Sequence, residues 1–190
     1  VGTRRMAARE KTVTVKLYPV VVAGGSGTRM KTDLPKQFLE LGGKTVLQWS
    51  LECFDAVPET VDITVVLPAV WIEEGKKRLA GWKQIHPVKY ICGGMRRQDS
   101  VEAGVSSLPD DDGWVAVHDG ARPCVTPELI AETIKCAKRN GCGVAASRIW
   151  DTIKYVERGS TVDHTVDRTK LWAVQTPQAF SAELLTRAYR

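Results

Sequence analysis

Residues 18–29 read YPVVVAGGSGTR, an apolar run followed at once by a glycine-rich loop. The three consecutive valines at 20–22 predict a strand buried on both faces, as in a parallel sheet. Glycines lack a Cβ atom, so the backbone N–H groups of residues 24–27 could approach an anion closely. Ligands of open parallel sheets bind beyond the carboxyl ends of the strands, so this stretch predicts a phosphate-binding loop at the edge of an α/β sheet.

The loop matches neither of two familiar nucleotide-binding motifs. The dinucleotide fingerprint requires a third glycine at the position of Met30, and the Walker motif requires a glycine at the position of Phe38. Arg29 and Lys36 place two cations near the loop, where they would stabilise charge on a phosphoryl group in transfer. The alternative interpretation is a glycine-rich turn with two surface cations.

The rest of the chain alternates strand-like and helix-like segments, which predicts one α/β domain over residues 1–190 with a mostly parallel sheet flanked by helices. Further strands are expected at 63–67, 88–92, 114–117 and 143–147, and helices at 46–54, 73–79, 100–108 and 128–139. Thr126 is the expected N-cap of the last helix, with Pro127 in its first turn. Residues 151–168 are polar and β-branched with a turn at 158–160. They predict a β-hairpin arm that needs a partner surface, because an isolated hairpin is marginally stable.

Two more loops follow predicted strands. The first contains Gly93 and Gly94, then Met95 and Ser100, and offers backbone donors and a hydroxyl, although a helix cap with surface arginines is the plainer interpretation. The second is H-D-G-A-R-P, residues 118–123.

In this last loop Asp119 could hold Mg²⁺ or orient a substrate hydroxyl, and Arg122 could clamp a phosphate. These two residues could instead simply pair with each other. His118 is expected to be a structural hydrogen-bonding residue.

Composition excludes several classes of protein. The formal net charge is +5 and the pI is about 9.0, which suits a phosphate-rich substrate, but the basic residues are scattered and no nucleic-acid-binding motif occurs. No apolar run approaches the roughly 20 residues of a membrane-spanning helix. The 5 cysteines form no C-x-x-C pair, which favours a reduced, cytoplasmic protein. The sequence therefore predicts neither a nucleic-acid nor a membrane partner.

Seven motifs occur in order along the chain: V-V-A-G-G-S-G-T-R-M, P-K-Q-F, G-G-M-R-R-Q-D-S-V, H-D-G-A-R-P, D-T-I-K, H-T-V-D-R and L-W-A-V-Q-T-P-Q-A-F. From about residue 18 to residue 189 this set closely resembles the 2-C-methyl-D-erythritol 4-phosphate cytidylyltransferase family. The resemblance implies a Rossmann-like nucleotidyltransferase fold with a protruding β-hairpin dimerisation arm. It also implies transfer of CMP from CTP to methylerythritol phosphate, with Mg²⁺ as cofactor and diphosphate as leaving group, in the non-mevalonate isoprenoid pathway.

The resemblance implies roles for individual residues. In the family, the loop matching Ala23, Gly24 and Gly25 wraps the triphosphate, and the cations matching Arg29 and Lys36 stabilise the transition state.

The positions of Gly94, Met95 and Ser100 line the cytosine pocket. Asp119, a metal-ligand candidate, and Arg122 match residues near the sugar phosphate and the metal-bound triphosphate.

The resemblance further implies a homodimer that exchanges the arms, so that Thr152 and Arg168 bind the acceptor in the partner's site, Arg168 there counting as catalytic. The family pattern continues beyond the position of Arg190 with an Asn-x-Lys-x-Thr motif that this sequence lacks. Met95 stands where relatives often carry an acidic residue. Two alternatives stay open: a ribitol-5-phosphate cytidylyltransferase, and a non-catalytic nucleotide-binding relative.

Overall fold

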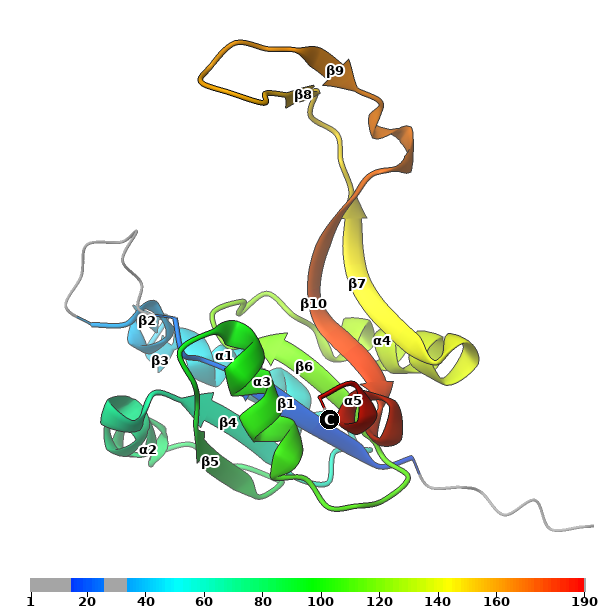
Figure 1. Ribbon diagram of the computed structural model, residues 1–190. Coiled ribbons are helices and arrows are strands. Elements are labelled where there is room, and N and C mark those ends of the chain that lie inside the picture. Colours follow the sequence, from blue (N-terminus) through cyan, green and yellow to red (C-terminus); the bar gives the residue numbers. More distant parts are fainter. Residues whose placement is uncertain (1–14, 26–33, 190) are drawn as a thin grey trace, which may run out of the picture.

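The computed structural model describes residues 15–25 and 34–189 and has a six-stranded sheet with helices on both faces (Figure 1). The strand order is β5 (Val88–Cys92), β4 (Ile63–Leu67), β1 (Leu17–Val22), β6 (Trp114–Asp119), β10 (Trp172–Ser181) and β7 (Cys142–Arg148). Strands β5, β4, β1 and β6 pair in parallel, and β10 is antiparallel to both of its neighbours. The predicted mostly parallel α/β sheet is confirmed.

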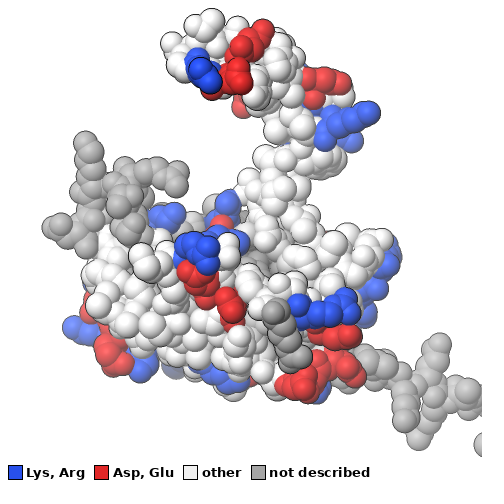
Figure 2. Space-filling view, viewed as in Figure 1, with Lys and Arg blue, Asp and Glu red and all other residues white. Residues whose placement is uncertain are grey.

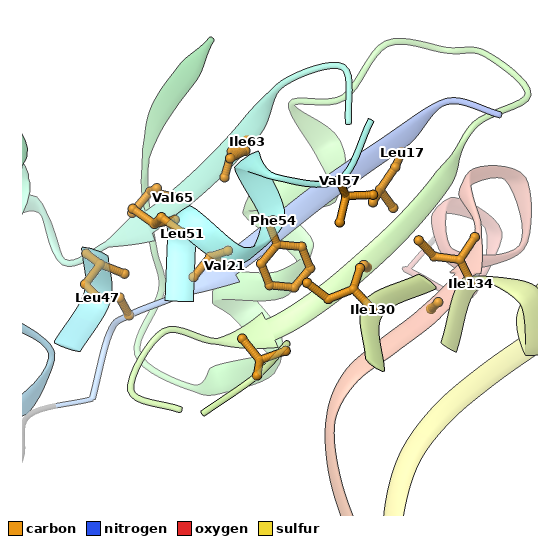
Figure 3. Packing of buried hydrophobic residues seen from close by; sticks show 14 of the residues in the cluster. Leu17, Val21, Leu47, Leu51, Phe54, Val57, Ile63, Val65, Ile130 and Ile134 are labelled. Carbon is orange, nitrogen blue, oxygen red and sulfur yellow. The ribbon is translucent and has the colours of Figure 1, made fainter. Parts of the chain in front are cut away.

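Side chains of β1 alternate between two layers of core. Leu17 and Val21 face a layer that contains residues of α1 (Val46–Asp55), α2 (Ile72–Leu79) and α4 (Pro127–Asn140). Figure 3 shows side chains of α1 and α4 directed at the strands in this layer. Val20 and Val22 face the other layer, with α3 (Arg97–Ser106) and α5 (Ala182–Tyr189). Both faces of β1 are thus buried, as the run of valines predicted.

Helix starts follow local hydrogen-bond chemistry. The Thr126 hydroxyl accepts a hydrogen bond from the Leu129 N–H at 3.2 Å, which confirms the predicted N-cap of α4. Helix α3 begins at Arg97, three residues before the predicted start at 100, because the Asp99 carboxylate accepts the backbone N–H of Arg96 at 3.0 Å. This bond satisfies a donor that would otherwise be unpaired at the helix N-terminus.

Residues between β7 and β10 form a two-stranded antiparallel sheet of β8 (Ile153–Tyr155) and β9 (His164–Val166) that projects away from the body (Figure 1). Its role in dimerisation stays a prediction. The short elements are η2 (Lys36–Phe38), β2 (Glu40–Leu41), β3 (Lys44–Thr45), η3 (Ala69–Trp71) and η4 (Arg168–Lys170). Within residues 15–25 and 34–189, no helix combines the length and the apolar character needed to cross a membrane.

Candidate active site

The loops that follow β1, β5 and β6 open onto one cavity of about 520 Å³. Its lining includes nine of the site residues predicted from the sequence: Ala23, Gly24, Gly25, Lys36, Gly94, Met95, Ser100, Asp119 and Arg122. Among the described residues of the lining, four are cations and one is a carboxylate: Lys36, Arg96, Arg97 and Arg122, and Asp119. Figure 2 shows basic side chains, with a few acidic ones, on the side of the body from which the hairpin projects. The cavity therefore suits a polyanionic ligand.

The segment P-K-Q-F places Lys36 at the glycine-rich loop. The Phe38 ring is fully buried and packs against Trp71, with ring centroids 5.8 Å apart, which anchors η2 to the core. Next to it, the buried Gln37 side chain donates from Nε2 to the Ala23 carbonyl at 2.5 Å. Lys36 is left on the cavity side, where its Cε lies 3.7 Å from the position of a Cβ added to Gly25.

The absence of a Cβ atom has different effects at Gly25 and at Gly94. Among the described residues, an added Cβ at Gly25 would meet an ordinary van der Waals contact with Lys36, so their packing does not require glycine there. The glycine instead keeps side-chain atoms out of the cavity. An added Cβ at Gly94 would lie 2.4 Å from the Asp99 Cβ and would disturb the start of α3. The Ser100 hydroxyl lies in the same turn, 3.4 Å from the Gly94 carbonyl, and Met95 is fully exposed at the cavity rim.

Two arginines hold Asp119. Arg97 Nε donates to Asp119 Oδ1 at 2.8 Å, and Arg122 Nε donates to Asp119 Oδ2 at 3.0 Å. Burial raises the pKa of the Asp119 carboxyl, but the hydrogen bonds and charges of the two arginines outweigh it and leave the pKa below its usual value. The alternative that Asp119 pairs with Arg122 is thus present in the structure, as part of a three-residue cluster.

His118 supports this loop from the protein core. Its imidazole is fully buried and contacts the Phe54 ring at a centroid distance of 5.2 Å. Burial lowers the pKa of His118 to about 4, so the ring is neutral at pH 7. Nε2 donates to the Arg122 carbonyl at 3.2 Å, because a carbonyl can only accept, and Nδ1 therefore accepts from the Thr176 hydroxyl at 2.9 Å. The predicted structural role of His118 is confirmed.

The residues that line the cavity fit a Mg²⁺ ion that binds together with the phosphates of a substrate. Within the described part of the chain, no cluster of three or more His, Cys, Asp or Glu residues could hold a metal ion by itself. Among the described residues that line the cavity, Asp119 supplies the carboxylate. Mg²⁺ is commonly bound by one or two carboxylates together with substrate phosphates, so the residues fit an ion held between Asp119 and a triphosphate.

Three predicted site residues are not among those that line the cavity in the described part of the chain. Arg29 is outside the described residues. Thr152 comes just before β8 and Arg168 just after β9. Both are exposed, and neither lines the cavity of its own chain. Gln37 and Arg97 also belong to the site but were not predicted from the sequence, although both lie in the family-like motifs P-K-Q-F and G-G-M-R-R-Q-D-S-V.

Comparison with known proteins agrees with this geometry. The profile of the family described as IspD: 2-C-methyl-D-erythritol 4-phosphate cytidylyltransferase matches residues 17–190. The 2-C-methyl-D-erythritol 4-phosphate cytidylyltransferase of Halalkalibacterium halodurans is 43% identical over 175 residues, which cover 91% of this chain and 75% of the relative. The Lachnospira eligens protein of the same name is 38% identical over 170 residues, covering 90% and 74%. A bifunctional IspD/IspF enzyme of Desulfotalea psychrophila is 40% identical over 171 residues, 90% of this chain and 44% of that enzyme.

Solved structures give the same result. The crystal structure of 4-diphosphocytidyl-2C-methyl-D-erythritol synthase from Anaerococcus prevotii superposes with a TM-score of 0.78 at 29% identity, covering 93% of this chain and 74% of that chain. The enzyme from Thermus thermophilus superposes with a TM-score of 0.68 at 30% identity, covering 90% and 73%. From the fold, the cavity and these matches together, the chain belongs to the IspD family of 2-C-methyl-D-erythritol 4-phosphate cytidylyltransferases.

Proposed function

We propose that this chain transfers CMP from CTP to 2-C-methyl-D-erythritol 4-phosphate and releases diphosphate. The observation that carries the proposal is the convergence of three loops, after β1, β5 and β6, on one cavity with a cationic lining. Family membership selects the nucleotide and the acceptor. The relatives described above are named for methylerythritol phosphate, which favours this acceptor over ribitol 5-phosphate.

The chemistry follows from the charges of the reactants. A phosphate oxygen of the acceptor forms a bond to the α-phosphorus of CTP, while the bond from that phosphorus to the bridging oxygen of the leaving diphosphate breaks. The attacking phosphate is already anionic at neutral pH, so the reaction requires no general base. This agrees with a buried His118 whose two ring nitrogens are both occupied by hydrogen bonds. Catalysis by the described residues then rests on positioning and on cations such as Lys36.

Asp119 and the triphosphate oxygens would hold Mg²⁺. When bound, the ion would neutralise phosphate charge during the transfer. The part played by the protein is to present Asp119, as an ionised carboxylate, at the carboxyl end of β6.

We further propose a homodimer in which the hairpin reaches the partner's cavity, so that Thr152 and Arg168 contact the acceptor there. The hairpin and its base expose large apolar side chains, among them Trp150 at 78%, Trp172 at 51% and Val174 at 59%. A second subunit covering them would remove this surface from water. Light scattering at micromolar concentration should give a dimer, and a monomer alone would contradict the exchange of arms.

A reducing compartment, the cytoplasm, is the proposed location. All five cysteines, Cys53, Cys92, Cys124, Cys136 and Cys142, are free thiols.

The proposed activity is tested by diphosphate release with CTP and Mg²⁺, offering methylerythritol phosphate and ribitol 5-phosphate in parallel reactions. Release with methylerythritol phosphate only is expected, and mass spectrometry should find the cytidine diphosphate derivative of the polyol. Faster release with ribitol 5-phosphate would move the assignment to that acceptor. CTP binding without turnover by either acceptor would mark a non-catalytic relative.

A further inference from the structure

Arg97 connects two loops that are far apart in sequence. It is the first residue of α3, yet its Nε contacts the carboxylate of Asp119, 22 positions away at the end of β6. Its neighbour Arg96 behaves differently, because the Arg96 guanidinium pairs with Asp99 of the same helix at 2.6 Å. Both arginines line the cavity, but Arg96 supports the start of α3, whereas Arg97 connects α3 to the loop after β6.

The contact uses only part of the Arg97 guanidinium. Nε is bound to Asp119, and within residues 15–25 and 34–189 the terminal nitrogens Nη1 and Nη2 have no hydrogen-bond partner. Arg122 differs, since its Nη1 donates to the Gln175 side chain while its Nε holds the other oxygen of Asp119. The Arg97 side chain is 49% exposed and lines the cavity. Its position is therefore fixed at one edge and open to a ligand at the other.

We propose that Arg97 binds phosphate oxygens in this cavity and that Asp119 positions it for that task. A guanidinium offers paired N–H donors in a rigid fork that matches two phosphate oxygens, and fixing Nε beforehand reduces the ordering that binding requires. The ligand is either the triphosphate of the nucleotide or the phosphate of the acceptor. This assignment of the ligand rests on the proposed function, whereas binding of an anion does not depend on turnover.

The test compares Arg97→Gln and Arg97→Lys with the wild-type protein. Calorimetry measures the Kd for CTP and for inorganic tripolyphosphate without acceptor, and steady-state kinetics measure KM for methylerythritol phosphate. Arg97→Gln loses a charge-assisted contact, so the Kd or KM of at least one of these ligands should rise by about 10- to 100-fold. Arg97→Lys should recover part of the loss, because it restores the charge but not the fork. The ligand whose Kd or KM rises shows whether Arg97 contacts the triphosphate of the nucleotide or the phosphate of the acceptor.

Arg187→Gln is the matched control, since Arg187 is an exposed arginine on α5 that pairs with Glu183 at 4.0 Å, outside the cavity. It should change every constant by less than about twofold, as expected for an exposed ion pair. A double-mutant cycle adds Asp119→Asn, and the effect of Arg97→Gln on binding should shrink in that background, because the positioning carboxylate is gone.

Three results would overturn the proposal. The first is a folded Arg97→Gln protein that binds CTP, tripolyphosphate and acceptor as the wild type does. The second is a lower melting temperature as its only change, which would make the ion pair structural. The third is a wild-type protein that binds none of the three anions. Wild-type protein that binds CTP but shows no turnover would contradict the proposed function alone, because the binding comparison can still be made.

Discussion

His118 should make the folded state sensitive to acid. Protonation of the ring would place a hydrogen on Nδ1, which accepts from the Thr176 hydroxyl, and would put a charge in the layer that holds Phe54. Thr176 in turn accepts the Asp119 N–H at 3.2 Å, so the same bond supports the loop at the cavity. Protonation therefore costs stability at the base of the proposed active site.

The size of the effect follows from the pKa of His118, which burial lowers from 6.5 to about 4. Between these values the unfolded chain binds the proton and the folded protein does not, so the free energy of unfolding falls as the pH falls through this window. The linkage relation gives a loss of about 2 kcal/mol between pH 7 and pH 5, approaching about 3 kcal/mol near pH 4.

Urea unfolding at pH 7 and pH 5 measures the effect, with His118→Gln as the comparison, because the amide can donate and accept but does not titrate. Carboxylates whose pKa is shifted contribute to the pH dependence of both proteins, so the informative quantity is the difference between them. The wild-type protein should lose about 2 kcal/mol more than His118→Gln. Equal losses in the two proteins would refute the reasoning.

Three further predictions concern the cavity. Lys36→Met should lower kcat by about 100- to 1,000-fold at unchanged melting temperature, because it removes a cation near the transferred group, and a rate close to wild type would exclude that role. Gly25→Ala should weaken CTP binding in calorimetry with little change in stability, whereas Gly94→Ala should lower the free energy of unfolding by about 1–3 kcal/mol, and the reverse order would contradict the contacts at these glycines. Gln37→Leu should raise KM for CTP, because the Ala23 carbonyl loses its hydrogen bond. Its effect on stability should be small, because the substitution also removes an Oε1 that has no partner in the described part of the chain. A stability loss above about 3 kcal/mol with unchanged KM would count against this.

The sequence predicted the central elements of the fold well where pattern and capping agree. Strands β4 and β5 have the expected bounds, and α4 has its predicted N-cap. Strand β10 and helix α5 were not anticipated. The β10 sequence, WAVQTPQAFS, contains a proline and mixes polar and apolar residues without a clear period, so it did not predict a strand. The structure shows the corresponding irregularity, since the pairing register with β7 shifts between Val174 and Gln178.

The candidate site was predictable to the level of its loops. Sheet topology brings the carboxyl ends of parallel strands together, so glycine and charge motifs after β1, β5 and β6 had to converge. The roles of Arg97 and Gln37 depend on contacts between loops, with Asp119 and with Ala23, and no local pattern encodes such pairings. Whether Thr152 and Arg168 join the site depends on a second subunit.

Attack of the acceptor phosphate on the α-phosphorus of CTP is the central claim, and it is tested by following the oxygens of the acceptor. Methylerythritol phosphate labelled with ¹⁸O in its phosphate group is incubated with CTP, Mg²⁺ and the protein, and the products are analysed by mass spectrometry. Attack by that phosphate on the α-phosphorus predicts that the label stays entirely in the cytidine diphosphate product and that the released diphosphate is unlabelled. Label in the diphosphate, or no cytidine diphosphate product from a protein that binds both substrates, would contradict the account.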